Sequence, residues 1–375
     1  MIYSDFKGKK LSRLGMGTMR LPVIDGKSSD INEKEVAEMV DIAIKNGVNY
    51  FDTAWMYHRG NAETVIGRAL AKYPRESFYL ATKFPGFSQK QVESKEEIFE
   101  TQLKKCGVEY FDFYLFHSLT SENIDWYTDK KYGILDYLLE QKRLGRIKHL
   151  GFSAHASYDD LVRFLDANGE YMEFCQLQAN YLDWTFQSAK EKVELMRSRG
   201  IPVWVMEPVR GGSLASLPEK DEKALKAMRP DESIAAWSFR FLQSVEGISV
   251  ILSGMSNREQ LIDNLGTFSD EKPLDEKEMS TLLGIADRMI TRVPCTECRY
   301  CTEYCPRELD IPKLLKVYNL YGSTVSGRVD PDDLEGIEED KRPDSCIGCR
   351  ACESVCPQSI KVSEVLAELN SKIKK

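Results

Sequence analysis

The chain has 375 residues, a hydrophobic fraction of 42% and a formal net charge of −8 at pH 7. Its length predicts two domains, and its acidic balance, extended by the stretch at residues 330–340, excludes the broad basic surface that nucleic acid requires. No apolar run is long enough to cross a membrane and the N-terminus lacks a signal-peptide pattern, so we expect a cytoplasmic protein.

Short β-rich runs alternate with longer helical patterns through most of the chain. Eight strand-then-helix repeats predict an α/β fold, a (β/α)8 TIM barrel over residues 1–290. An open, doubly wound sheet is the alternative, although the G-x-G-x-x-G motif typical of open dinucleotide-binding folds is missing near the start of the sequence. The predicted strands are residues 14–18, 49–55, 78–84, 110–117, 147–153, 174–180, 202–207 and 248–254, and the helices between them include residues 62–73, 95–107, 158–169 and 233–245.

Three of the predicted strands end in ionisable residues, Asp52, Lys83 and His117, and Tyr57 follows Asp52 by five positions. Because strand ends converge on one face of a parallel barrel, these side chains could share a pocket. Each residue alone is more typical of a cap or a surface charge, but their joint occurrence favours catalysis. A lysine–aspartate pair beside a phenol favours phenolate, which predicts a pKa of Tyr57 lowered from about 10 toward working pH.

In these segments, FDTAWMY, ATKF and FYLFH, the chain resembles the aldo-keto reductase family, whose (β/α)8 barrels use nicotinamide without a Rossmann domain. The resemblance implies Tyr57 as general acid, Lys83 and Asp52 as its tuning pair, and His117 as the group that orients the carbonyl. It further implies an NAD(P)H-dependent enzyme that interconverts a small-molecule carbonyl compound and an alcohol by hydride transfer.

Further segments resemble the cofactor-binding regions of that family. The resemblance implies that LGMGTMRL, GFSAH and CQLQANY lie at the nicotinamide, MEPVRGGSL along the pyrophosphate and SGMSNREQLIDN at the adenosine. Met206 stands where many members stack an aromatic ring on the nicotinamide, and Ala154 where they have an asparagine. Arg258 is the only cation of the last segment that could read a 2′-phosphate, which favours NADP, with NAD as the alternative. The implied cofactor-binding residues are Gly17, Thr18, Met19, Asp52, Ser153, Gln176, Met206, Pro208, Val209, Gly212, Leu214, Ser253, Gly254, Arg258, Gln260 and Asn264.

Residues 291–375 form the second predicted domain and contain eight of the ten cysteines, in two C-x2-C-x2-C-x3-C runs that each end in Cys-Pro. This spacing is typical of [4Fe-4S] ferredoxins, although zinc is the alternative for any C-x2-C pair. We expect a small α+β ferredoxin-like domain with two [4Fe-4S] clusters, in which the fourth cysteine of each run binds the other cluster. The expected ligand sets are Cys295, Cys298, Cys301 and Cys356 for one cluster, and Cys346, Cys349, Cys352 and Cys305 for the other.

The cysteine runs and the segment between them indicate the compartment and the folding of the second predicted domain. Thiols gathered in metal-site runs indicate a reducing compartment and a fold that depends on its metal. The segment between the runs, residues 306–345, is rich in Gly, Pro, Ser and Asp in its later part, and we predict a loop with little core of its own.

The two predicted cofactor types do not match in electron number. Nicotinamide gives up two electrons as hydride, a [4Fe-4S] cluster passes one, and no flavin-site pattern links them. The clusters could therefore form a structural lid over the barrel, or serve a redox partner protein or a one-electron step on the substrate. The alternative function is an electron-transfer protein that relays single electrons to or from a molecule docked on the barrel. A catalytically silent binding subunit is disfavoured because the four candidate catalytic residues, Asp52, Tyr57, Lys83 and His117, are all present.

Overall fold

The computed structural model describes residues 1–289, 293–322, 329 and 334–373. The chain divides into two compact units, Met1–Ile285 and Ala286–Lys375, and each is described by itself. The predicted domain boundary near residue 291 lies outside the described residues.

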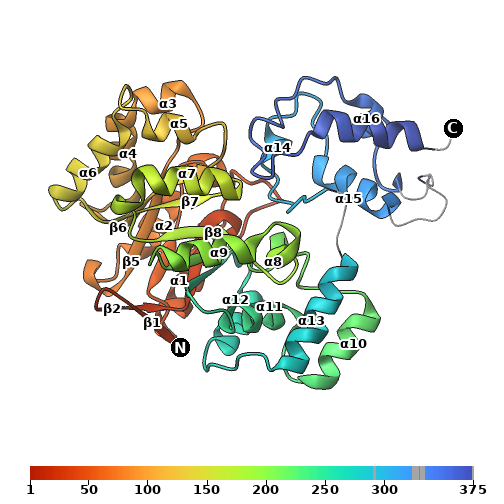
Figure 1. Ribbon diagram of the computed structural model, residues 1–375, viewed down its shortest axis with the longest axis horizontal. Helices are drawn as coiled ribbons and strands as arrows, with labels where there is room; N and C mark the ends of the chain where they lie inside the picture. Colours follow the sequence, from red (N-terminus) through yellow and green to blue (C-terminus); the bar gives the residue numbers. More distant parts are fainter. Residues whose placement is uncertain (290–292, 323–328, 330–333, 374–375) are drawn as a thin grey trace. The chain divides into compact units, whose positions relative to one another are not determined.

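Eight strands of the first unit close into a barrel in which all neighbouring strands are parallel (Figure 1). The prediction of a (β/α)8 barrel is confirmed, and the open doubly wound alternative is wrong. Strands of a parallel barrel are buried on both faces, which explains why they read as nearly continuous apolar runs. In closed order the strands are β10 (Ile248–Ser253), β3 (Leu14–Gly17), β4 (Tyr50–Asp52), β5 (Tyr79–Phe84), β6 (Phe111–Leu119), β7 (Ile147–Ala154), β8 (Cys175–Gln178) and β9 (Val203–Met206).

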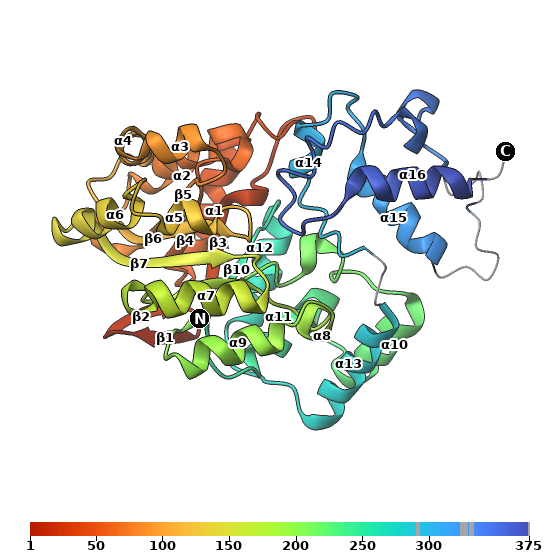
Figure 2. The same cartoon turned by 45° about the horizontal axis from the view of Figure 1, so that its top comes forward.

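Helices follow the strands and cover the outside of the barrel (Figure 2). Residue choice sets their ends: Ser157 caps α7 by accepting from the Asp160 backbone N–H, and Gly107, at φ +64°, ends α4 in the left-handed conformation. The helices are α1 (Glu33–Lys45), α2 (Ala62–Leu70), α3 (Gln89–Glu93), α4 (Lys95–Cys106), α5 (Ile124–Thr128), α6 (Ile134–Arg143), α7 (Tyr158–Asn168), α8 (Asp183–Phe186), α9 (Ala189–Ser198), α10 (Glu219–Met228), α11 (Ile234–Gln243), α12 (Arg258–Thr267) and α13 (Glu276–Met289). Short 3-10 turns are η1 (Thr18–Arg20), η2 (Tyr57–Gly60), η3 (Arg75–Ser77), η4 (Gly169–Tyr171) and η5 (Arg210–Gly212).

An antiparallel hairpin that the sequence did not predict, β1 (Tyr3–Phe6) and β2 (Lys9–Ser12), precedes the barrel. Its Phe6 ring lies 5.2 Å from Trp204 and 5.5 Å from Phe113 between ring centroids, in a cluster at the amino ends of the strands. The hairpin therefore closes that end of the barrel, and the carboxyl ends of the strands remain for chemistry.

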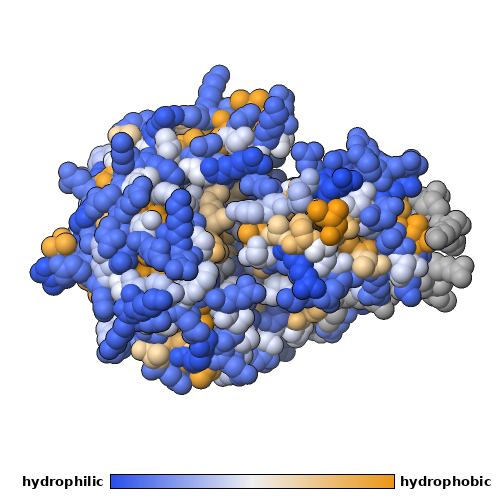
Figure 3. All heavy atoms as spheres, turned by 90° about the horizontal axis from the view of Figure 1, so that it is seen from above, coloured by the Kyte–Doolittle hydropathy of each residue, from blue (hydrophilic) through white to orange (hydrophobic). Residues whose placement is uncertain are grey.

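The molecular surface is of mixed polarity. The face drawn in Figure 3 is mostly hydrophilic, with small scattered hydrophobic areas, which is normal for a globular chain. None of the helices in the described ranges is both long and apolar enough to span a bilayer.

The described part of the second unit contains α14 (Tyr300–Glu303), α15 (Ile311–Gly322) and α16 (Val362–Lys372), with one isolated parallel bridge between Val329 and Ile373. Two 3-10 turns, η7 (Glu339–Lys341) and η8 (Pro343–Ser345), precede the second cysteine run. Helices α15 and α16 lie side by side (Figure 1), joined by a 2.8 Å hydrogen bond from Tyr318 to Glu368.

The prediction of a loop over residues 306–345 is wrong at its start. Helix α15 lies in that segment, and its Leu314, Leu315 and Val317 are buried in the core of the unit. The Gly-, Ser- and Asp-rich residues that dominate the composition follow the helix in the sequence, and residues 323–328 and 330–333 among them lie outside the described residues. The amphipathic pattern that begins at Ile311, after a carboxylate at Asp310 that accepts from the Lys313 N–H, was the signal for it.

Candidate active site

Three residues of the predicted constellation meet in direct hydrogen bonds. Asp52 ends β4, Tyr57 begins η2 just beyond it, and Lys83 lies near the end of the neighbouring strand β5. Lys83 Nζ donates to Asp52 Oδ1 at 2.6 Å, to the Thr53 carbonyl at 2.9 Å and to Tyr57 Oη at 3.2 Å. Lys83 and Asp52 are only 0% and 3% exposed, so this contact is shielded from water.

His117 completes the group from β6. Its ring lies edge to face with Tyr57, with centroids 5.9 Å apart, and the Phe87 ring lies 5.1 Å from it on another side. Burial lowers the pKa of His117 well below its usual range, and the charge of Lys83 lowers it further. The imidazole is therefore neutral near pH 7. Its Nδ1 has no hydrogen-bond partner within the described residues, so the ring can accept or donate toward a bound molecule.

Tyr127 of α5 fixes the position of His117, a role that no residue pattern indicated. Its hydroxyl lies 2.7 Å from the His117 carbonyl and accepts from the Gly86 N–H at 2.8 Å. A Cβ at Gly86 would lie 2.3 Å from the tyrosine ring, so only glycine permits this approach. The loop after β5 and the end of β6 are thus locked together.

The predicted lowering of the Tyr57 pKa is wrong for this structure. Burial raises the pKa of Tyr57 well above its usual value, and the charges of Asp52 and Glu207 raise it further. Burial lowers the pKa of Lys83, and Asp52 counteracts that effect. The effect of burial on the Tyr57 pKa is larger than the opposite effect of the nearby Lys83 ammonium. Tyr57 is therefore a neutral phenol that can donate a proton.

Several predicted cofactor-binding residues lie at strand ends beside this group. Gln176 of β8 donates to Asp52 Oδ2 at 3.1 Å, and the Ser153 hydroxyl of β7 accepts from the Ser118 N–H at 2.7 Å. Thr18 is fully buried, and its hydroxyl has no partner in the described part of the chain. The buried, unpartnered hydroxyl fits a site for a polar ring substituent, whereas Gln176 and Ser153 already have partners.

The predicted adenosine segment lies at the end of β10 and the start of α12. Asn264 donates to the Ser253 hydroxyl at 2.9 Å, and the Gln260 side chain accepts from the Ser256 N–H at 2.7 Å. The Ser253 carbonyl lies 3.5 Å from where a Cβ of Gly17 would be, so the first-strand segment adjoins this one. Arg258 is exposed in the first turn of α12.

The loop after β9 is built on unusual backbone. Glu207 and Arg210 have φ of +57° and +47°, values that cost non-glycine residues of order 1 to 3 kcal/mol each. Asn180 donates to the Glu207 carbonyl at 3.0 Å, and Arg210 Nε donates to Asp183 Oδ1 at 3.1 Å, which holds the loop in place. Met206, Pro208, Val209, Gly212 and Leu214 all belong to this loop or its flanks.

Glu207 is a site feature that the sequence reasoning missed. Burial raises its pKa most, Arg20 lowers it, and the Gly211 N–H, which donates to the carboxylate, lowers it further. Its charge also acts on Tyr57. An acidic group therefore lies in the segment that was expected to follow a pyrophosphate, and arginines lie close enough to offset it.

Six of the eight cysteines of the second unit lie in or against its hydrophobic core. Cys301 and Cys352 are buried members of that core, and Cys295, Cys305, Cys346 and Cys356 pack against it. A small cavity of the unit is lined by the set predicted for one cluster, Cys305, Cys346, Cys349 and Cys352, together with apolar and arginine side chains. Among the described residues, no group of three or more His, Cys, Asp or Glu is arranged to hold a single metal ion.

The other predicted set gathers around Cys301. Burial raises the pKa of the Cys301 thiol, and the neighbouring sulfurs of Cys298, Cys356, Cys295 and Cys352 raise it further. Three of these four neighbours belong to its predicted ligand set, so the fourth cysteine of the second run lies near the first run. This crossing of ligands fits a ferredoxin-type pair of clusters in its donor chemistry.

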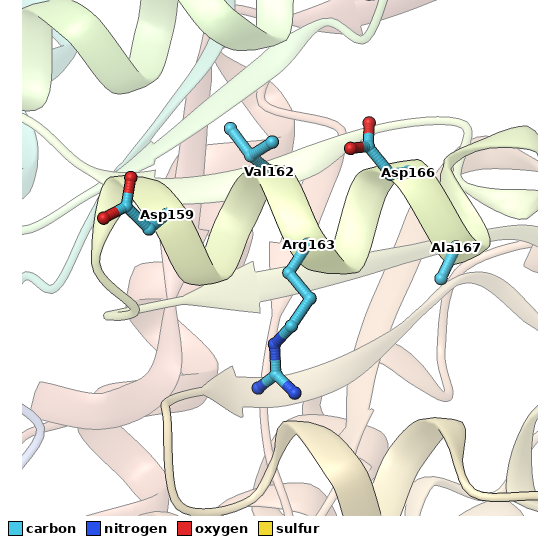
Figure 4. Close-up of a pocket in the computed structure, with 5 residues that line it drawn as sticks. All are labelled: Asp159, Val162, Arg163, Asp166 and Ala167. Carbon is cyan, nitrogen blue, oxygen red and sulfur yellow. The ribbon is translucent and has the colours of Figure 1, made fainter.

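A shallow surface hollow lies on the outer helix α7, away from the residues described above. Figure 4 shows its lining residues Asp159, Val162, Arg163, Asp166 and Ala167, all on the outer helix α7. Arg163 pairs with Asp125 at 2.8 Å. None of the residues discussed above lines the hollow, and it carries no group placed for catalysis.

Comparison with known families agrees with the two units of the chain. Residues 13–287 match the aldo/keto reductase family, and residues 294–361 match a 4Fe-4S dicluster domain.

The chain belongs to the aldo/keto reductase family.

Among curated relatives of this family, a probable aldo-keto reductase 1 of Glycine max is 32% identical over 216 residues, which cover 55% of this chain and 58% of the relative. The NADH-specific methylglyoxal reductase of Escherichia coli is 27% identical over 228 residues, which cover 56% of this chain and 68% of that one. The chain thus aligns with little more than half the length of the soybean protein.

Solved aldo/keto reductases share the barrel. The holo form of a Bacillus halodurans enzyme matches with a TM-score of 0.61 at 22% identity, covering 74% of this chain and 93% of that chain. A Klebsiella pneumoniae aldo-keto reductase in complex with NADPH matches with a TM-score of 0.61 at 17% identity, covering 77% of this chain and 96% of that chain. At these identities the likeness supports the fold.

Proposed function

We propose that this chain is an NAD(P)H-dependent oxidoreductase that interconverts a carbonyl compound and an alcohol by hydride transfer. The observation that carries the proposal is the contact of one buried lysine, Lys83, with both Asp52 and Tyr57, at 2.6 and 3.2 Å. A buried ammonium held between a carboxylate and a phenol has little structural use, because burying a charge costs free energy that an apolar side chain avoids. The same arrangement suits proton transfer at a carbonyl oxygen.

Each residue of the group has a separate role. Tyr57 is neutral, so it donates its phenolic proton to the carbonyl oxygen as negative charge develops there. Lys83, which donates to Tyr57, stabilises the phenolate that remains, and Asp52 keeps Lys83 in position. His117, a neutral imidazole, holds the carbonyl oxygen within reach of Tyr57. The nicotinamide supplies the hydride when bound.

The residues proposed to hold the cofactor are those at the strand ends beside the four catalytic side chains. Thr18, Ser153 and Gln176 would hold the nicotinamide, the loop after β9 the pyrophosphate, and the segment from Ser253 to Asn264 the adenosine. NADP is proposed first because of Arg258 and because a structural neighbour binds NADPH, while the name of the E. coli relative keeps NADH as the alternative.

The substrate is proposed to be a small carbonyl compound. Two aromatic rings, Tyr57 and Phe87, lie within 6 Å of the His117 ring and restrict the space around it. The E. coli relative is named for methylglyoxal, a compound of this class, which supports a small polar aldehyde or ketone as the first to be tested.

The second unit is proposed to hold two [4Fe-4S] clusters with crossed ligand sets and to act as a cap on substrate binding. The second candidate is electron transfer, in which the clusters serve a redox partner protein. Cys349, a member of the cavity-lining set, is exposed, which favours that candidate because an exposed ligand brings a cluster close to a partner.

Replacement of Tyr57 by Phe tests the enzymatic proposal. The variant keeps the ring but loses the proton, so turnover of methylglyoxal with NADPH should fall about 10²- to 10⁴-fold. Cofactor binding, followed by quenching of protein fluorescence, should stay at the wild-type value. The matched control is Tyr181→Phe, a buried barrel tyrosine whose hydroxyl has no partner within the described residues. Turnover by Tyr57→Phe equal to that of the control would reject the assignment.

A further inference from the structure

Behind the four catalytic side chains lies a second buried carboxylate, Glu63, in the first turn of α2. It is 0% exposed. Its Oε1 accepts from Thr82 Oγ1 at 2.8 Å and from Gln102 Nε2 at 2.7 Å, and Lys105 Nζ lies 3.5 Å from its Oε2. Every partner is a donor, so the carboxylate is held as an acceptor on both oxygens. Burial raises the pKa of Glu63, and the hydrogen bonds from Thr82 and Gln102 and the charge of Lys105 counteract that effect.

The first set of contacts leads to Lys83. Thr82 is the residue before Lys83 on β5, and Gln102 Nε2 lies 3.0 Å from the Lys83 carbonyl as well as from Glu63. Tyr114 of β6 donates to the other end of the Gln102 amide at 2.5 Å, which fixes its orientation. Thr82 and Gln102 thus connect Glu63 to strand β5, which carries Lys83.

The second set of contacts leads to Tyr57. Lys105 Nζ donates to the Gly60 carbonyl at 3.1 Å and lies 4.1 Å from the centroid of the Trp55 ring. Gly60 closes the turn η2 that begins at Tyr57, and Trp55 precedes it. Lys105 therefore holds both flanks of the turn that presents Tyr57, and Glu63 holds Lys105.

We infer that Glu63 is a positioning residue, a single buried carboxylate that fixes the strand of Lys83 and the turn of Tyr57 relative to each other. The inference rests on the proposed function, because it assigns Lys83 and Tyr57 to proton transfer. A rigid support of this kind matters because a displacement of about 1 Å can cost about 10²-fold in rate.

The charge of Glu63 adds a measurable effect on Lys83. The titratable groups that face Lys83 are Asp52 from β4, Tyr57 from η2, His117 from β6 and Glu63 from α2. Burial lowers the pKa of Lys83, and Asp52 and then Glu63 raise it. Removal of the Glu63 charge therefore lowers the pKa of Lys83, so the ammonium loses its proton at a lower pH.

Glu63→Gln tests the inference. The amide keeps an oxygen for Thr82 and Gln102 but turns an N–H₂ group toward Lys105, so it breaks the link to the turn of Tyr57. We expect kcat for carbonyl reduction to fall about tenfold at unchanged KM for the carbonyl compound. The alkaline limb of the kcat profile should move to lower pH by about 0.5 to 1 unit, the scale of one charge at an effective dielectric constant of about 20.

Two further variants separate position from charge. Lys105→Met removes the link to Gly60 but keeps Glu63, so kcat should fall while the alkaline limb stays. Asp112→Asn removes another buried carboxylate, which accepts from the Leu80 N–H of the same strand β5 and pairs with Arg75. This control should unfold at a lower temperature and leave the pH profile at the wild-type position.

A direct titration makes the test independent of activity. In protein labelled with ¹⁵N-lysine, the Lys83 ζ-nitrogen is assigned by its loss in Lys83→Met, and its titration should move to lower pH in Glu63→Gln. If that variant does not fold, Glu63→Gln combined with Lys105→Met removes both charges of the pair and should give the same shift. A wild-type titration and a wild-type pH profile in the folded variant would overturn the inference. Absence of carbonyl reduction by the wild-type protein would instead reject the proposed function, and the titration would still decide the role of Glu63.

Discussion

The barrel and the cysteine unit both bury groups that form charges, and in the barrel the buried charged side chains pair with side chains of the same unit. Lys83 meets Asp52, and Glu63 meets Thr82, Gln102 and Lys105. In the cysteine unit, burial raises the pKa of the Cys301 thiol and the neighbouring sulfurs raise it further. Burial, the charge of Glu353 and the neighbouring sulfurs together raise the pKa of the Cys352 thiol to about 11. Thiolates gathered this closely repel one another, and a metal centre that binds them removes that repulsion.

This difference indicates two kinds of stability in one chain. The barrel is closed, its amino end is filled by the aromatic cluster around Phe6, and its buried charges are paired, so it should fold without metal. The core of the second unit includes two cysteines and is surrounded by four more, so removal of the clusters removes the centre of that core.

Iron removal should give the largest effect. Anaerobic treatment with a chelator should lower hydrogen-exchange protection of α15 and α16 by at least about 10²-fold, because binding at a structural metal site contributes many kcal/mol to folding. Strands β4 to β7 should keep their protection. Equal loss in both units would mean that the barrel also depends on the clusters, and retained protection in α15 would mean that the second unit does not.

Single cysteine replacements sharpen the comparison within the second unit. The wild-type protein should contain about eight iron atoms, the content of two [4Fe-4S] clusters. Cys305→Ser should reduce this to about four and remove the signal of the cluster bound by Cys346, Cys349 and Cys352. The control is Cys106→Ser in the barrel, which should leave iron content unchanged. Loss of the cluster bound by Cys295 and Cys298 instead would contradict the crossed assignment.

Replacement of Arg258, which tests the preference for NADPH over NADH, should give the smallest of these effects. Arg258 is exposed, and an exposed charge pair contributes only about 0.2 to 1 kcal/mol, so Arg258→Ala should raise the Kd for NADPH by about five-fold or less. The Kd for NADH should stay constant. Arg163→Ala, on the outer helix α7, is the matched control. An equal change for both cofactors would remove the basis for preferring NADP, since only NADPH carries the 2′-phosphate.

The fold was predictable because its signals are local. Each barrel strand is a short apolar run, and the carboxyl ends of parallel strands must converge, so Asp52, Lys83 and His117 could be grouped from the residue pattern alone. The cysteine spacing likewise indicated iron–sulfur chemistry. Helix α15 was missed because the Gly- and Asp-rich residues after it dominated the composition of the segment.

The energetics of the site were less predictable because they depend on burial. The direction of the Tyr57 pKa shift follows mainly from burial of the phenol, which the residue pattern does not reveal. Glu63 was missed for the same reason, since one glutamate in an amphipathic helix is ordinarily a surface residue. Glu207 was missed because its segment was interpreted through resemblance to a pyrophosphate loop.

The proposed function requires that the barrel performs two-electron chemistry with its own paired residues, without electrons from the clusters. Stopped-flow absorbance of anaerobic protein mixed with NADPH alone tests it most directly. We predict that the visible absorption of the clusters stays unbleached over many turnover times, and that NADPH is consumed only after a carbonyl compound is added. Rapid bleaching of the clusters by NADPH before any substrate is present would contradict the claim.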